Sequence, residues 1–172
     1  MTLKHYILEI QSRQPLYHFT TSDNLINILK TNILKPSLTL TNTGEQNDSK
    51  YISLTRKYDF AKEWEHMGDT RLTLHTDKLR NNYKIIPHDE RIISYPEERQ
   101  YWKEEQEERI LVEGKEGITN LDRYLIQIDI MDEWYEDYLH YYDHDNIQEI
   151  INEAKKLTNV TINLVNKWKP YK

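Results

Sequence analysis

Three groups of polar side chains on strand-like segments are the candidates for chemistry in this sequence. They are a histidine in an aromatic, apolar segment (His18), two hydroxyl residues that alternate with apolar ones (Ser53 and Thr55), and an amide with a carboxylate at the start of a later apolar run (Gln106 and Glu108). Imidazole, hydroxyl and amide groups can hydrogen-bond to a ligand, and a fixed carboxylate favours a transition state that develops positive charge. The three groups therefore suit ligand recognition and electrostatic catalysis.

Several other catalytic chemistries lack the residues that they need. The chain has no cysteine, which excludes thiol catalysis, disulfides and cysteine-ligated zinc. It has no GxSxG motif of a serine hydrolase, and its four glycines form neither a phosphate loop nor a dinucleotide fingerprint. His140 and His144 are spaced like two metal ligands on one helix face, but no third ligand accompanies them at a useful spacing. We therefore expect no metal site.

A strand followed directly by a helix is expected to position His18. Residues 16–20 are aromatic and β-prone, and the hydroxyl and carboxylate residues at 21–23 are typical caps of a helix start. An apolar stripe at helical spacing then continues to about residue 34. Strand alternation places His18 on the same face as Leu16 and Thr20. On this pattern alone, a hydrogen-bonded core histidine is the alternative to a site residue.

The hydroxyl pair lies on a second expected strand. Residues 51–56 alternate strictly between apolar and polar side chains, which predicts a half-buried strand. The apolar members face the core, and Tyr51, Ser53 and Thr55 form a short polar shelf on the other side. The alternative is that this shelf is only the solvated side of the sheet.

The carboxylate lies where a third strand is expected to begin. Ile110 belongs to the apolar centre of that strand, and Gln106 and Glu108 share a face if the strand already runs through them. The alternative is that residues 104–108 form the solvated end of a charged helix.

The remaining patterns predict one α+β domain that spans residues 1–172, with about six to eight short strands and three to five helices. No linker, repeat or low-complexity segment divides the chain. Further segments are expected as follows: strands at 71–76, 83–86, 124–130 and 160–164; helices at 58–67, 97–106, 131–144 and from a cap at Asp145 to 157; a polar link at 77–79; an ambiguous strand or helix at 6–10; a loop at 36–50 with a brief strand at 38–40.

Composition limits the class of protein. With 37% hydrophobic and 30% charged residues, the core is modest and the surface strongly solvated, and 13 tyrosines and four tryptophans supplement the core. The net charge of −6 argues against broad electrostatic capture of nucleic acid. We find no signal-peptide pattern and no apolar run of membrane-spanning length. A cytoplasmic protein without membrane contact is therefore expected.

In their order along the chain, the three polar segments resemble motifs of the ADP-ribosyltransferase superfamily, of the group with histidine, tyrosine or serine, and glutamate. LYHFTTSDNLINIL looks like the first strand and helix of DarT-type toxins and of ADP-ribosyltransferase-like phage proteins. ISLTR and EERI look like the second and third motifs. The resemblance covers residues 16 to 112 in patches. It implies a split β-sandwich of short, mostly antiparallel strands with flanking helices, and NAD as the cosubstrate.

The resemblance also implies which residues bind NAD. His18 would hydrogen-bond to a ribose hydroxyl, with Thr20 near the same sugar or the nicotinamide amide. Ser53 and Thr55 would shape the nicotinamide site. The spacing does not fix the aromatic residue that stacks on the nicotinamide ring, and the candidates are Tyr51 and Tyr58.

Three further residues would carry catalysis if the resemblance holds. Glu108 would bind the 2′-hydroxyl of the nicotinamide ribose and stabilise the sugar cation, Gln106 would position the nucleophile, and Arg56 would lie near the pyrophosphate or the acceptor. Glu107 competes with Glu108 for the role of the acid, and residues 97–99 repeat the same Glu-Glu-Arg triplet upstream.

The expected function is NAD-dependent mono-ADP-ribosylation of a macromolecule, with DNA or RNA ahead of protein as the acceptor. A toxin or phage effector would act in the bacterial cytoplasm, and an antitoxin or a host defence protein could be its partner.

Two other functions compete with this one. The first is a non-catalytic interaction protein, such as a phage inhibitor of host defence, that binds through the acidic aromatic segment 131–145. The second is an enzyme like the RNA 2′-phosphotransferases, which also consume NAD, but the chain lacks the basic cluster that such an enzyme needs.

Overall fold

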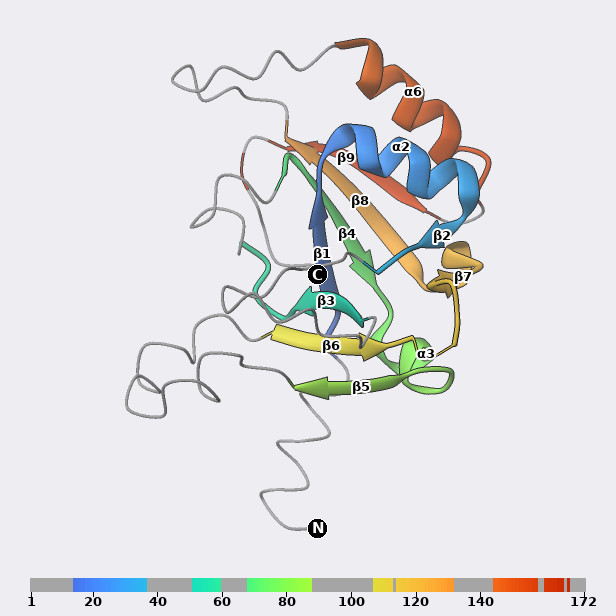
Figure 1. Cartoon of the computed structure of the whole chain (residues 1–172). Helices are drawn as coiled ribbons and strands as arrows, with labels where there is room; N and C mark the ends of the chain where they lie inside the picture. The colour runs from blue at the N-terminus through green and yellow to red at the C-terminus, as the bar shows by residue number, and fades with distance from the viewer. Residues whose placement is uncertain are drawn as a thin grey trace, which may run out of the picture.

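A seven-stranded, mostly antiparallel sheet dominates the computed structural model (Figure 1). The structure describes residues 14–36, 51–59, 68–87, 107–112, 114–131, 144–157, 160–165 and 167. Among them the strand order is β5-β6-β3-β1-β4-β8-β9, and only β8 and β9 run parallel. The strands are β1 (Leu16–Thr20), β3 (Tyr51–Thr55), β4 (Thr70–Leu74), β5 (Lys84–Pro87), β6 (Glu107–Leu111), β8 (Leu125–Met131) and β9 (Thr161–Val165). The described residues therefore form an α+β fold, as the sequence predicts.

The sheet narrows between β1 and β3. These two strands are paired at one position, Tyr17 with Thr55, whereas β1 and β4 pair at five positions and β3 and β6 also at five. In Figure 1, β3, β6 and β5 run across the direction of β1, β4 and β8. The sheet thus consists of two halves, β5-β6-β3 and β1-β4-β8-β9, joined by a short ladder.

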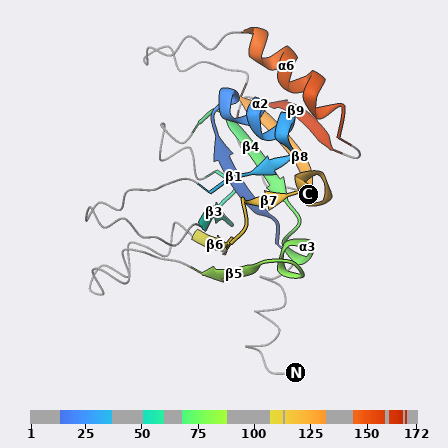
Figure 2. The ribbon, with the colours of Figure 1, turned by 45° about the vertical axis from the view of Figure 1, so that its right-hand side comes forward.

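Two helices pack beside each other against the larger half, as Figures 1 and 2 show for α2 (Ser22–Thr31) and α6 (His144–Ala154). Leu25 and Leu29 of α2 and Ile150 of α6 are buried in the same core cluster as Leu72 and Ile128 of the sheet. The apolar residues that alternate along β4 and β8 face these helices. This apolar layer is the core.

The start of α2 is held from two sides, which fixes the helix relative to β1. Thr21 caps the helix, and its hydroxyl accepts from Asn24 N at 3.4 Å. Asp69, at the entrance to β4, accepts from Ser22 N at 2.9 Å and also from the Ser22 hydroxyl. The hydrogen bonds from Asn24 N to Thr21 and from Ser22 N to Asp69 satisfy N–H groups that a helix start leaves unpaired. At the other end Asn32 adopts the left-handed conformation (φ 54°) that stops the helix.

Three short elements complete the described fold. β2 (Ile33–Leu34) pairs with β7 (Ile118–Thr119), and a 3-10 turn, η4 (Leu121–Arg123), precedes β8. Helix α3 (Thr76–Arg80) follows β4. None of the helices in the described part of the chain is long and apolar enough to cross a membrane.

Most of the expected strands are confirmed within one or two residues, but three details were wrong. The strand expected at 71–76 ends at Leu74, and the expected polar link at 77–79 is part of α3, whose single buried apolar residue, Leu79, shows no periodicity. Helix α6 begins at His144, so Asp145 lies within it rather than at its cap, and it ends at Ala154 rather than at 157. The two-residue strands β2 and β7 are too short to leave a pattern. The expectations for 6–10, 38–40, 97–106 and most of 58–67 and 131–144 lie outside the described residues.

Gly68 allows β4 to start directly beside the end of β1. It has φ +107°, and a Cβ added there would lie 2.2 Å from the carbonyl oxygen of Thr20. Gly114 also has a positive φ (+68°), but an added Cβ would meet nothing within 4 Å. We expect Gly114→Ala to cost about 1–2 kcal/mol for the backbone conformation alone. Gly68→Ala should cost clearly more, because it adds a clash with the backbone. Urea denaturation of both variants checks this, and equal losses would contradict it.

Candidate functional site

The three segments that the sequence singled out are neighbouring strands. β3, which carries Ser53, lies between β1, which carries His18, and β6, which begins with Glu107 and Glu108. Residues 35 to 54 positions apart in the chain, such as His18 and Ser53 or Ser53 and Glu107, are thus adjacent in space. The topology of the described residues therefore brings the three strands together, whereas the face of each side chain depends on the register.

His18 joins the two halves of the sheet where the ladder between β1 and β3 stops. Its Nδ1 lies 3.1 Å from the carbonyl oxygen of Ser53. A carbonyl can only accept, so Nδ1 carries the hydrogen, and in the neutral ring Nε2 is an acceptor. Burial lowers the pKa of His18, and the hydrogen bond to Ser53 opposes this only in part. The imidazole is therefore neutral near pH 7, with Nε2 able to accept from a hydroxyl.

The neutral state of the half-buried His18 makes stability depend on pH. When pH falls below about 6.5, the unfolded chain protonates this histidine while the folded chain resists, so the free energy of unfolding decreases. His18→Asn keeps an N–H donor for the Ser53 carbonyl but does not titrate. We expect wild type to lose more stability than His18→Asn between about pH 7.5 and 5.5. Urea denaturation at both pH values measures this, and parallel losses would refute it. His75, whose pKa burial also lowers, is present in both proteins and cancels.

A polar cluster covers one face of β3 and β6. The ladder pairs Ser53 with Arg109 and Thr55 with Glu107, which places these side chains on the same face. The Ser53 hydroxyl donates to Glu107 Oε1 at 2.8 Å, and Arg109 Nε donates to the same oxygen at 3.1 Å. The Arg109 guanidinium also lies 3.8 Å above the ring of Tyr51. The expected polar shelf is confirmed, and a carboxylate is fixed on it.

Glu108 points to the opposite face of the same strand. The ladder pairs it with Leu54, and it forms an ion pair with Arg56 Nε. Its side chain is 9% exposed. Arg80 Nη2 lies 3.9 Å from Oε2, which has no hydrogen-bond partner among the described residues. Two arginines therefore neutralise this carboxylate at the edge of the apolar layer.

The structure thus divides the expected site residues between two faces of β3 and β6. Tyr51, Ser53 and Thr55 lie with Glu107, which the sequence left as the competing acid, and Arg56 lies with Glu108. Tyr17 pairs with Thr55, so the next residue of β1, His18, has its side chain on the face of Glu108. Three others occupy separate places: Thr20 is buried at the end of β1, Tyr58 lies in the turn after β3, and Gln106 is outside the described residues.

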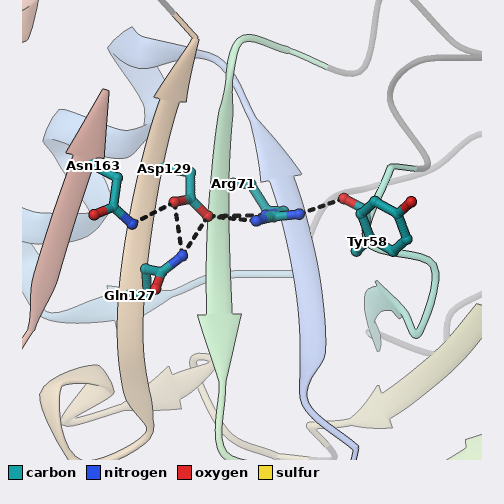
Figure 3. Close-up of polar contacts among 5 residues, drawn as sticks. All are labelled: Tyr58, Arg71, Gln127, Asp129 and Asn163. Carbon is teal, nitrogen blue, oxygen red and sulfur yellow. Dashed lines mark hydrogen bonds and ion pairs between the residues drawn. The ribbon is translucent and has the colours of Figure 1, made fainter. Parts of the chain in front are cut away.

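A buried charge network that the sequence patterns did not indicate lies on the larger half of the sheet (Figure 3). Arg71 of β4 and Asp129 of β8 are each 1% exposed, and Arg71 Nε and Nη2 donate to Asp129 Oδ2 at 3.1 and 2.6 Å. Gln127 and Asn163 donate to the same carboxylate at 2.7–2.9 Å. Arg71 Nη1 donates to the Tyr58 carbonyl at 2.5 Å. A charged residue within each of two apolar strands was the signal that could have indicated this pair.

A metal centre does not arise from these side chains. In the described ranges, no group of three histidine, cysteine, aspartate or glutamate residues is placed to hold a metal ion. Of the two histidines with metal-ligand spacing, His144 begins α6, and His140 lies outside these ranges.

Comparisons with protein-family models, curated proteins and solved structures found no match to this chain.

Proposed function

We propose that this protein is an NAD-dependent ADP-ribosyltransferase that transfers ADP-ribose to a macromolecule. The observation that carries the proposal is the pair of hydrogen bonds that Ser53 makes, since its carbonyl accepts from the His18 ring and its hydroxyl donates to Glu107. It connects the three motifs on which the resemblance to ADP-ribosyltransferases depends.

The shape of the sheet supports the fold that the resemblance implies. A split β-sandwich has two groups of strands that diverge, and here β3, β6 and β5 turn away from β1, β4, β8 and β9 at a single ladder pair. His18 and Ser53 lie at that junction. NAD would bind beside it, with contacts to both halves.

Glu107 is the better candidate for the catalytic acid than Glu108. Both contacts to Glu107 from described residues, from Ser53 and from Arg109, fall on Oε1, which leaves Oε2 for a ribose hydroxyl. Both carboxylates are ion-paired, Glu107 with Arg109 and Glu108 with Arg56, but the Glu108 side chain is 9% exposed and the Glu107 side chain 19%. A carboxylate that is already oriented and partly exposed can stabilise positive charge without reorganisation.

In the proposed reaction, the bond between ribose C1′ and the nicotinamide nitrogen breaks, and nicotinamide leaves with the electron pair. Glu107 stabilises the positive charge on the ribose. His18 Nε2, which the register places on the other face, accepts a hydrogen bond from a ribose hydroxyl where NAD passes the end of the β1–β3 ladder. A nucleophile of the acceptor then bonds to C1′ and loses its proton to solvent. The reaction is balanced without a metal or an oxidant.

Incubation with NAD that carries a label on the adenylate phosphate, together with bacterial lysate, tests the proposal. The label should appear in macromolecules, and separate treatment with nuclease and protease then distinguishes nucleic acid from protein as the acceptor. The absence of both labelling and NAD binding at millimolar concentration would refute the proposal.

A second candidate, a non-catalytic interaction protein, is favoured by one observation. Glu108, the residue that the sequence ranked first as the acid, is buried in an ion pair. A folded protein that does not bind NAD but forms a complex with one host or antitoxin protein would support this function.

A further inference from the structure

The buried network around Arg71 extends across most of the sheet. It begins at Asn163 on β9, continues through Asp129 on β8 to Arg71 on β4, and ends at the carbonyl of Tyr58, in the turn that follows β3. Figure 3 shows that the Arg71 side chain reaches this carbonyl from β4 past the neighbouring strand. That strand is β1, and its Tyr17 ring lies 4.8 Å from the guanidinium carbon.

This path crosses the junction at which the sheet is weakest. Between β1 and β3 the backbone ladder has one residue pair. The Arg71–Tyr58 hydrogen bond ties the larger half of the sheet to the chain that leaves β3, so it adds a side-chain link where backbone links are few. The turn at residues 56–59 is also held locally, because Lys57 N donates to the Thr55 hydroxyl at 3.0 Å.

We propose that Arg71 is a positioning residue that sets the orientation of the β5-β6-β3 half relative to the β1-β4-β8-β9 half. This proposal depends on the proposed function for its catalytic consequence, because His18 belongs to one half and Glu107 to the other. Arg71 touches neither NAD nor the acceptor. It acts through the Tyr58 carbonyl on the strand that carries Ser53.

The contacts of the Arg71 guanidinium fit a positioning role better than a role in the ion pair with Asp129 alone. Nε and Nη2 of Arg71 are occupied by Asp129, and Nη1, on the other side of the planar group, reaches Tyr58. A guanidinium fork can hold two partners in fixed directions, whereas a lysine ammonium acts as a point charge. Asp129 is in turn held by side-chain amides from β8 and β9, so the partner of the guanidinium is itself fixed in position.

The experiment compares three variants with wild type by NMR of the full chain. Arg71→Lys keeps the charge opposite Asp129 but loses the fork. Arg71→Met combined with Asp129→Leu removes both charges together, so that neither remains buried alone. Asn163→Leu is the matched control, since it removes a hydrogen bond from Asp129 on the side away from Tyr58. Residual dipolar couplings report the angle between the halves, and hydrogen exchange reports the protection of the 56–59 turn.

We expect the two Arg71 variants to change the angle between the halves and to speed exchange in the turn by about 3- to 10-fold, the factor for loss of one hydrogen bond. The control should change both clearly less, because it leaves the hydrogen bond from Arg71 to the Tyr58 carbonyl in place. Wild-type couplings and exchange in a folded Arg71→Lys protein would overturn the proposal. If the double variant does not fold, Arg71→Lys alone decides.

The catalytic consequence is measured separately. In an active protein, Arg71→Lys should lower kcat by up to about 10²-fold, more than it raises KM for NAD, as expected for misplaced catalytic groups. If wild type neither binds nor cleaves NAD, the proposed function fails, and the dipolar couplings still decide whether Arg71 positions the two halves. If wild type is active and kcat does not change in Arg71→Lys, the catalytic consequence is refuted.

Discussion

Replacing Glu107 with glutamine is expected to lower the rate of NAD cleavage by about 10²–10³, because one oriented electrostatic contact with the transition state is lost. The glutamine keeps the size of the side chain and an oxygen acceptor for the Ser53 hydroxyl and for Arg109. The effect should therefore fall on kcat rather than on folding. Release of labelled nicotinamide under single-turnover conditions measures it.

Glu108→Gln is the matched control on the next residue. It weakens the buried ion pair with Arg56, so it should reduce stability while the remaining folded protein keeps its rate. If Glu108→Gln abolishes NAD cleavage and Glu107→Gln does not, the assignment of the acid is wrong, and the site lies on the other face of β3 and β6. Equal, small effects of both variants would contradict an enzymatic role for either carboxylate.

Asp129→Leu is expected to reduce the free energy of unfolding by about 3–5 kcal/mol, because it leaves the charge of Arg71 buried without its partner. That is a large part of the 5–15 kcal/mol that is typical of a whole domain. The double variant with Arg71→Met should be more stable than Asp129→Leu by about 2 kcal/mol or more, since a pair of apolar side chains often replaces a buried ion pair at little cost.

Urea denaturation of wild type, both single variants and the double variant completes the cycle. An additive result, with the double variant as unstable as the sum of the singles, would mean that Arg71 and Asp129 do not act as a pair. The Gln127 and Asn163 amides also lose their acceptor in Asp129→Leu, so part of the loss comes from them. Gln127→Met alone gives the size of that part.

The proposals for function and for Arg71 concern the same feature, a sheet whose halves meet at one ladder pair. His18 contributes a hydrogen bond across that junction, and Arg71 contributes another from the opposite face. An enzyme that binds a ligand between two diverging halves needs their angle to be fixed before the ligand arrives. Side chains can supply this rigidity where the backbone ladder does not.

Local patterns were sufficient to predict much of the framework. Strict alternation at 51–55 predicted both the strand and its two faces, because successive side chains of a strand point to opposite sides. The cap at Thr21 and the apolar stripe of α2 predicted a helix directly after β1. The resemblance to known motifs also directed attention to three segments that prove to be neighbouring strands. Each of these features is encoded within a few consecutive residues.

The choice between Glu107 and Glu108 was decided only by the tertiary structure. The two residues are adjacent, so they point to opposite faces, and a shift of one residue in the register of β6 against β3 would exchange them. Nothing within the strand itself sets that register. The observed pairing places Glu107 beside Ser53 and Glu108 beside Leu54.

The sequence by itself determined most strands of the large sheet, the helix that follows β1 and the polar side of β3, because each depends on periodicity and capping among near neighbours. The tertiary structure alone decided which carboxylate joins Ser53 and that Arg71 pairs with Asp129, 58 positions away. Both outcomes depend on which strands lie next to each other and in what register. Strand order and register are set by burial of the whole apolar layer, and no short segment of the chain determines that burial.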